Sequence, residues 1–209
     1  MVVLASGSGT NLQAILAAAA DGRLPALVTG VVANREGVRA LDRAVLAGVP
    51  TTVVAPRPGE VRAEYDERLA DAVAAFDPDV VVLAGWMRIL TMSFLGRFPH
   101  RVINLHPALP GELPGIHAIE RAHAEHLAGN RTGTGVMVHL VPDEGVDVGP
   151  VLASCAVPIH AGDTVDDLAD RIHAAEHPLL VDTLAAFVRS LPDVQPSLAS
   201  HQRHREVPA

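Results

Sequence analysis

The sequence predicts an α/β fold, with an open, doubly wound, mostly parallel sheet of the Rossmann-like type in a single domain. The first observation is that short aliphatic runs alternate with helical patterns along most of the chain. The second is composition, because 49% of the residues are hydrophobic but only 3% are aromatic, which favours aliphatic strands covered by Ala-rich helices. Such alternation requires right-handed crossovers, so ligands are expected beyond the carboxyl ends of the strands.

The first half of the chain carries most of the alternation. Each expected strand is a short apolar run, and each expected helix is amphipathic or rich in alanine. The strands are expected at 2–5, 27–33, 51–55 and 80–84, and the helices at 12–20, 38–47 and 60–76. The run at 80–84 lacks polar alternation, so we expect it to be a central strand covered on both faces.

The second half is less regular. Helical turns are expected at 86–90 and 93–98, a strand at 101–105, a helix at 118–128, β-rich runs at 135–141 and 150–158, and a long helix within 163–189 that begins near Thr164. Three prolines and two glycines predict an ordered or gated loop at 107–115. We expect a domain spanning 1–191 and a disordered tail at 192–209.

Charge and composition exclude several classes of protein. A net charge of −8 argues against a binder of duplex nucleic acid, which needs a basic surface. No apolar run approaches the roughly 20 residues of a membrane span, and no signal peptide is recognisable, so we expect a cytoplasmic protein. Every basic residue other than histidine is arginine, which excludes Schiff-base chemistry and the lysine-dependent phosphate loop.

The single cysteine and one group of histidines receive structural interpretations. Cys155 lies in an apolar, strand-like run and is predicted to be a core residue. His117, His123 and His126 share one expected helix but lack a recognised ligand spacing such as His-Glu-x-x-His. We therefore expect solvated histidines and no metal.

A glycine-rich loop spans Gly7–Asn11, between the first strand and the first helix. Its glycines let the backbone approach a ligand, and the free amides of the first helical turn can bind a phosphate. A tight turn with a polar helix cap explains the loop alone equally well. A dinucleotide is disfavoured because Leu12 replaces the third glycine of that motif and Asn34-Arg35 follows the second strand, although Arg35 leaves NADP open.

Asn104 lies in the strand expected at 101–105 and His106 follows it in extended backbone, two residues further on, so we expect their side chains to share one face. Pro107 ends the strand and places this pair at the carboxyl edge, where open α/β sheets bind ligands. A carboxamide and an imidazole therefore share one candidate site. A capped strand end is the structural alternative.

The segment Asp143–Pro150 is a turn rich in acidic residues and glycine. A solvated hairpin tip is the default interpretation. Asp147 could instead reach a histidine on a neighbouring strand, stabilise the protonated imidazole and raise its pKa.

Taken together, the segments 6–13, 83–90, 104–107 and 147–150 resemble those of the phosphoribosylglycinamide formyltransferases, within the wider formyltransferase family. The resemblance runs from about Val2 to Leu191. The Asn-x-His-Pro element alone indicates only the wider group, whereas the glycine loop in the same chain indicates enzymes acting on glycinamide ribonucleotide. One departure lies after His106, where the usual Pro-Ser-Leu-Leu-Pro reads Pro-Ala-Leu-Pro-Gly.

The resemblance implies transfer of a formyl group from 10-formyltetrahydrofolate, the co-substrate, to the amine of 5-phosphoribosylglycinamide in de novo purine biosynthesis. It implies small-molecule partners, without nucleic acid or membrane, and leaves open whether the chain forms a homodimer. The implied catalytic residues are Asn104, His106 and Asp147. The implied substrate-binding residues are Gly9, Thr10, Asn11, Leu12, Gln13 and Glu176. The implied folate-binding residues are Arg62, Met87, Arg88, Ile89, Leu90 and Asn104.

In the implied mechanism, the substrate amine attacks the formyl carbon while Asn104 and protonated His106 stabilise the oxyanion, and Asp147 sustains that protonation. The alternatives are a formyltetrahydrofolate hydrolase, which usually carries an additional N-terminal domain, and a methionyl-tRNA formyltransferase, which needs a basic C-terminal domain. A non-catalytic nucleotide-binding module is a third alternative. Such a module has no reason to bring these three side chains into one cleft.

Overall fold

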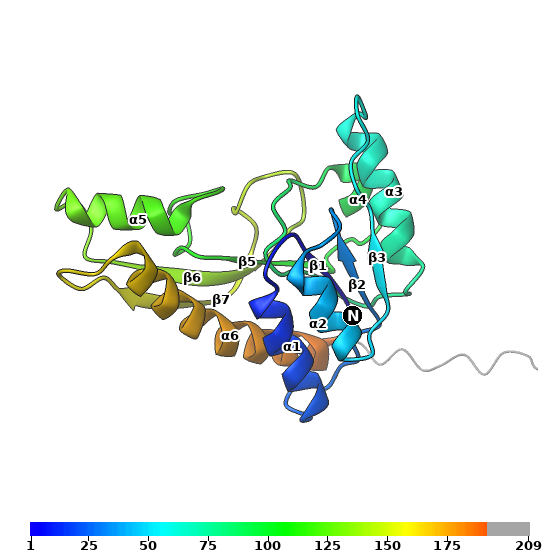
Figure 1. Ribbon diagram of the computed structural model, residues 1–209, viewed down its shortest axis with the longest axis horizontal. Coiled ribbons are helices and arrows are strands. Elements are labelled where there is room, and N and C mark those ends of the chain that lie inside the picture. The colour runs from blue at the N-terminus through cyan, green and yellow to red at the C-terminus, as the bar shows by residue number, and fades with distance from the viewer. Residues whose placement is uncertain (192–209) are drawn as a thin grey trace, which may run out of the picture.

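The computed structural model describes residues 1–191, and the tail predicted at 192–209 lies outside the described residues. The strands are β1 (Val2–Ala5), β2 (Gly30–Ala33), β3 (Thr51–Val53), β4 (Val81–Leu83), β5 (Val102–His106), β6 (Gly133–Leu140) and β7 (Val151–Pro158). They form one seven-stranded sheet in the order β3-β2-β1-β4-β5-β6-β7 (Figure 1). The first five strands are parallel to one another, whereas β6 pairs antiparallel with β5 and β7 pairs antiparallel with β6. The predicted mostly parallel, doubly wound sheet is confirmed.

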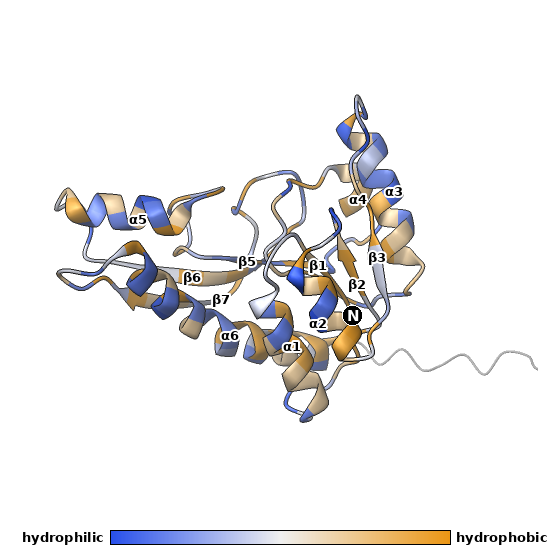
Figure 2. Cartoon of the chain, in the orientation of Figure 1, coloured by the Kyte–Doolittle hydropathy of each residue, from blue (hydrophilic) through white to orange (hydrophobic). Residues whose placement is uncertain are grey.

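Helices cover both faces of this sheet. They are α1 (Thr10–Ala20), α2 (Arg39–Leu46), α3 (Arg62–Ala74), α4 (Met92–Leu95), α5 (Ala118–Leu127) and α6 (Val165–Ser190). One apolar cluster joins the sheet to α1, α2 and α6, and a second joins it to α3 and α4. Both α5 and α6 carry hydrophilic and hydrophobic residues, as Figure 2 shows, so each helix has an apolar part to bury and a polar part for solvent.

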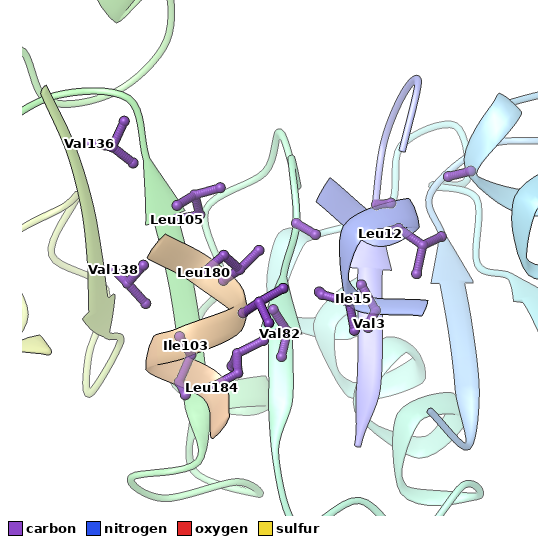
Figure 3. Close-up of a cluster of buried hydrophobic side chains, with 14 of the residues drawn as sticks. Val3, Leu12, Ile15, Val82, Ile103, Leu105, Val136, Val138, Leu180 and Leu184 are labelled. Carbon is purple, nitrogen blue, oxygen red and sulfur yellow. The ribbon is translucent and has the colours of Figure 1, made fainter. Parts of the chain in front are cut away.

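Strand alternation divides the core between the two faces. Val3 and Val82 belong to the cluster under α1 and α6, whereas Leu4 and Val81 belong to the cluster under α3 and α4. Figure 3 shows the first cluster, with side chains of α1 and α6 against those of β1, β4, β5 and β6. All three residues of β4 are buried, and the strand lies between β1 and β5. The prediction of a covered central strand is therefore confirmed.

Two local predictions differ from the structure. The strand expected at 27–33 begins only at Gly30, and Leu27 is exposed. The segment 86–90 is not helical, because its backbone groups bond to other segments: the N–H of Met87 donates to Ser6 Oγ, and Ile89 O accepts from Arg62. These partners lie far away in the sequence, so the local pattern at 86–90 could not reveal them.

The predictions for Cys155 and His123 are wrong. Cys155 is an exposed free thiol because β7 is the edge strand, and most of its residues face solvent. His123 is buried, and its Nε2 lies 2.7 Å from the carbonyl oxygen of Asp163. His126 Nδ1 lies 2.8 Å from the carbonyl oxygen of Arg131. Within residues 1–191, no cluster of three or more His, Cys, Asp or Glu side chains could hold a metal ion.

Within residues 1–191, no helix combines the length and the apolar composition required to cross a bilayer.

Candidate active site

The candidate site lies at the carboxyl end of β5, on the face of the sheet that α3 and α4 partly cover. Ile103 and Leu105 contribute to the opposite cluster, so Asn104 and His106 project together, as the period of two predicts. Asn104 is half-buried and His106 is 4% exposed.

Asp147 completes the predicted trio from the turn between β6 and β7. Its Oδ1 accepts a hydrogen bond from Asn104 Nδ2 at 3.0 Å, and its Oδ2 lies 3.3 Å from His106 Nδ1. The N–H of Gly115 donates to Oδ2 at 2.8 Å. Asp147 has a φ of 55°, in the left-handed region that aspartate tolerates better than most residues. The turn is therefore not a solvated tip throughout, because one of its acids points into the site.

Burial and charge act in opposite directions on the members of the trio. Burial lowers the pKa of His106, and this effect outweighs the opposing influence of the Asp147 carboxylate. Burial of Asp147 opposes its charge, but the histidines and the Gly115 N–H favour the charge more, so the pKa of Asp147 lies below its usual range. Asp147 thus favours the protonated imidazole, whereas burial of the ring opposes it and determines the direction of the shift in the pKa of His106.

The loop at 107–115 packs directly over His106. The carbonyl oxygen of Leu113 lies 3.0 Å from His106 Nε2, while Nδ1 faces Asp147. A neutral imidazole carries one proton, so one of these two contacts joins two acceptors. Arg121 fastens the loop by donating to Leu113 O at 2.6 Å and to Pro114 O at 2.7 Å. The loop, predicted to be ordered or gated, thus covers the imidazole.

His139 is a member of the site that the sequence analysis missed. It lies on β6 directly opposite Asn104, and its side chain is only 1% exposed. Its Nε2 lies 3.1 Å from Asn104 Nδ2, and its Nδ1 lies 2.9 Å from Leu140 O. The available signal was a single histidine within the apolar run 135–141, but only the register of β5 and β6 identifies its partner.

The glycine loop forms the N-terminal end of α1. Gly9 is the N-cap residue with a φ of 70°, and a Cβ there would lie 2.8 Å from the Cα and Cβ of Ala40. No side chain of the described residues caps the helix, so its first-turn amides are free of side-chain partners within that part of the chain. The side chain of Asn11 instead donates from Nδ2 to Glu176 Oε2 at 3.0 Å. Glu176 is 5% exposed, and burial raises its pKa against the opposing effect of Asn11.

The other predicted substrate-binding residues lie close to the glycine loop. Thr10, Leu12 and Gln13 occupy the first turn of α1, where the Leu12 side chain is buried. Gln13 Oε1 accepts a hydrogen bond from Arg43 at 3.1 Å. Arg35, considered for a nucleotide phosphate, donates from Nε and Nη2 to the carbonyl of Ser6.

The predicted folate-binding segment, residues 87–90, lies beside the glycine loop and near the acidic turn. Met87 is 66% exposed and Ile89 is also exposed, whereas Leu90 is buried. Arg62 donates to Ile89 O at 3.0 Å, and the Arg88 guanidinium lies 4.6 Å from the centre of the Tyr65 ring.

Two backbone contacts join this segment to its neighbours. The Met87 N–H donates to Ser6 Oγ at 3.1 Å, which connects the segment to the glycine loop. The N–H of Met92 donates to Glu144 Oε1 at 2.9 Å, which connects the following residues to the acidic turn. The structure therefore brings the glycine loop, the 87–90 segment and the trio to one end of the sheet.

The fold and the site define an α/β protein with a polar trio and a glycine loop at one sheet edge, an arrangement suited to an enzyme of small molecules. A family model described as formyl transferase matches residues 1–184. The phosphoribosylglycinamide formyltransferase of Schizosaccharomyces pombe is 44% identical over 200 residues, covering 90% of this chain and 96% of the relative. The corresponding protein of Escherichia coli is 38% identical, covering 88% and 86%.

Solved structures give the same result. The glycinamide ribonucleotide transformylase 1 of Symbiobacterium toebii has a TM-score of 0.84 and 40% identity, covering 90% of this chain and 86% of that structure. The phosphoribosylglycinamide formyltransferase of Bacillus halodurans has a TM-score of 0.85 and 34% identity, covering 92% and 97%. This chain belongs to the formyl transferase family.

Proposed function

We propose that the protein is a phosphoribosylglycinamide formyltransferase, which transfers the formyl group of 10-formyltetrahydrofolate to the amine of 5-phosphoribosylglycinamide in purine biosynthesis. The observation that carries this proposal is the convergence of Asn104, His106 and Asp147 at the sheet edge that also bears the glycine loop. The relatives that cover most of the chain have this activity in their names. A passive nucleotide-binding module has no use for the trio.

The ribonucleotide is assigned to the glycine loop. Its phosphate meets the amides of Gly9 to Gln13 at the positive end of α1. Glu176, held by Asn11, is the acceptor for the ribose hydroxyls. Within residues 1–191 this buried carboxylate has one side-chain partner, so it retains lone pairs for such donors.

The folate is assigned to the neighbouring segment 87–90. Backbone groups there meet the pterin ring, and the exposed Met87 and Ile89 side chains offer apolar surface. Arg62 and Arg88 supply two cations at the same corner, which suits the carboxylates of a folate.

The reaction then takes place at the trio. The neutral amine attacks the formyl carbon, and the carbonyl electrons move to the oxygen, which Asn104 and His106 stabilise by hydrogen bonding. The attacking nitrogen loses a proton, the C–N bond to the folate breaks, and the departing nitrogen receives a proton through His106 or a water held by Asp147. Before this, the substrate must displace Leu113 O from His106 and take over the Asn104 N–H bond to Asp147, while the bond to His139 is retained.

The decisive experiment is an absorbance assay for tetrahydrofolate formed from 10-formyltetrahydrofolate, run with and without 5-phosphoribosylglycinamide. Turnover that requires the ribonucleotide is expected. Turnover without it would identify a hydrolase, and no turnover in either reaction would contradict both enzyme assignments. The Asn104→Ala variant serves as the matched negative control, with a loss on the order of 10²–10³ in turnover.

The enzyme acts on small molecules in the cytoplasm without a metal, and its formyltransferase domain spans residues 1–191. Formation of a homodimer stays a prediction, which sedimentation equilibrium tests directly.

A further inference from the structure

His139 lies deep in the site but has no role in the mechanism above. Its side chain is buried on β6, and β5 places Asn104 directly across from it. Opposed residues on neighbouring antiparallel strands have their Cβ atoms about 4.5–5.5 Å apart, so their side chains must contact. The contact between His139 and Asn104 is polar, although most residues of β6 are apolar.

The hydrogen bonds of His139 select one tautomer. Nδ1 lies 2.9 Å from the carbonyl oxygen of Leu140, which can only accept, so Nδ1 carries the proton. In the neutral ring, Nε2 is then an acceptor, and Asn104 Nδ2 lies 3.1 Å away. Asp147 Oδ1 is farther from Nε2, at 3.5 Å. The amide of Asn104 is therefore the nearer partner.

The same contact fixes the orientation of the Asn104 amide. Its Nδ2 donates one hydrogen to Asp147 Oδ1 and the other to His139 Nε2. Both partners are acceptors, so an amide rotated by 180° would place Oδ1 against them and lose both bonds. The NH₂ group is thereby kept on the side of Asp147, which also contacts His106.

The surrounding backbone supports His139. Opposite the step from Val138 to His139, the register of β7 skips Leu152, an irregularity of the kind that re-aims side chains beside active sites. Gly149 packs against the Leu140 carbonyl so closely that a Cβ would lie 1.8 Å from its oxygen. The lack of a side chain at Gly149 thus leaves room for the carbonyl that sets the histidine tautomer.

We propose that His139 is a positioning residue, which as the Nδ1–H tautomer orients the Asn104 amide for stabilisation of the oxyanion. This inference rests on the proposed formyl transfer. The role differs from that of the trio, because His139 acts through Asn104 and need not touch the substrate.

Two matched substitutions separate this role from simple core packing. In His139→Gln, the side-chain oxygen can accept from Asn104 in place of Nε2, whereas in His139→Asn the shorter side chain reaches only the former Nδ1 position. We expect kcat to fall about 10–100-fold in His139→Asn and less than about 5-fold in His139→Gln, since a small misplacement of a catalytic group costs up to about 10²-fold. KM for both substrates should change by less than about 3-fold.

A double-mutant cycle then tests the route of the effect. In the Asn104→Ala background, the two His139 variants should have equal kcat, because the amide they position is gone. His123→Phe, which replaces another buried histidine with a backbone partner, controls for the cost of removing such a group. Equal losses in His139→Asn and His139→Gln, or a loss that persists without Asn104, would overturn the proposal.

A readout independent of turnover keeps this inference distinct from the proposed function. The side-chain NH₂ resonances of Asn104, followed by ¹H–¹⁵N NMR in the unliganded protein, should shift in His139→Asn and remain close to wild type in His139→Gln. If the wild-type protein failed to formylate the ribonucleotide but showed this NMR pattern, the positioning of Asn104 would stand and its catalytic purpose would fall. Unchanged resonances in both variants would overturn the positioning itself.

Discussion

Asn104 donates a hydrogen bond from Nδ2 to Asp147 Oδ1 at 3.0 Å, across 43 positions of sequence. The two residues come from the end of β5 and from the turn after β6, which are brought together by antiparallel pairing of these strands. The carboxylate also receives the Gly115 N–H and contacts His106. Asp147 is therefore the residue that connects Asn104, His106 and the loop at 107–115.

Replacing Asp147 by Asn should abolish most of the activity. The amide would face the Asn104 NH₂ and the Gly115 N–H with half the acceptor capacity and no charge. We expect kcat to fall by roughly 10²–10⁴, the usual contribution of a group that takes part in proton transfer. Steady-state kinetics measure this, with Asp143→Asn in the exposed part of the same turn as the control. Comparable losses of kcat in both variants would contradict a specific catalytic role for Asp147.

Replacing Arg121 by Ala should loosen the loop over His106. Its guanidinium is fixed to the carbonyls of Leu113 and Pro114, and these bonds would be lost. Amide hydrogen exchange within residues 108–115 should become faster, because opening costs less free energy. The control is Arg97→Ala, which removes an exposed ion pair with Asp71. An exchange rate at Gly115 equal to that of the wild type would contradict the fastening role of Arg121.

Acidification should destabilise the protein through His106. Because burial lowers its folded pKa below the ordinary value of 6.5, the unfolded chain binds the proton more tightly. The free energy of unfolding is therefore highest above that value and falls as pH drops toward the folded pKa. Urea unfolding at about pH 7.5 and about pH 5.5 should show a smaller decrease for His106→Gln than for the wild type. His177 has a pKa lowered by burial too, so part of the decrease remains.

Gly9 and Gly22 offer a matched pair of substitutions. Both have positive φ, but a Cβ at Gly9 would collide with Ala40, whereas a Cβ at Gly22 meets nothing within 4 Å among residues 1–191. Alanine at either position costs about 1–2 kcal/mol for the left-handed conformation, and overpacking at Gly9 adds about 1–3 kcal/mol. Gly9→Ala should also raise KM for the ribonucleotide, with the folate KM unchanged. Equal effects of the two variants on stability and KM would contradict binding of the ribonucleotide at the glycine loop.

Local patterns were sufficient for much of this molecule. The strand, glycine loop and helix at the start, and the projection of Asn104 and His106 from one face, follow from residue periods and turn residues alone. The long helix after Thr164 was also predictable, since Thr164 and Asp167 form a capping box.

Features that depend on distant neighbours were not predictable in this way. His139 reads as a lone histidine until β5 is placed beside it, and Leu113 reaches His106 only because Arg121 holds the loop. Cys155 lies in an apolar run, but its exposure depends on β7 being at the sheet edge. The balance between burial and charge at His106 likewise needs the packed structure.

The most direct test of the central claim is to measure both products of one reaction. With 10-formyltetrahydrofolate and 5-phosphoribosylglycinamide, mass spectrometry should find the formylated ribonucleotide in a 1:1 ratio to tetrahydrofolate, as the stoichiometry of group transfer requires, and His106→Ala should slow both equally. Tetrahydrofolate formed together with free formate, and without formylated ribonucleotide, would contradict the account.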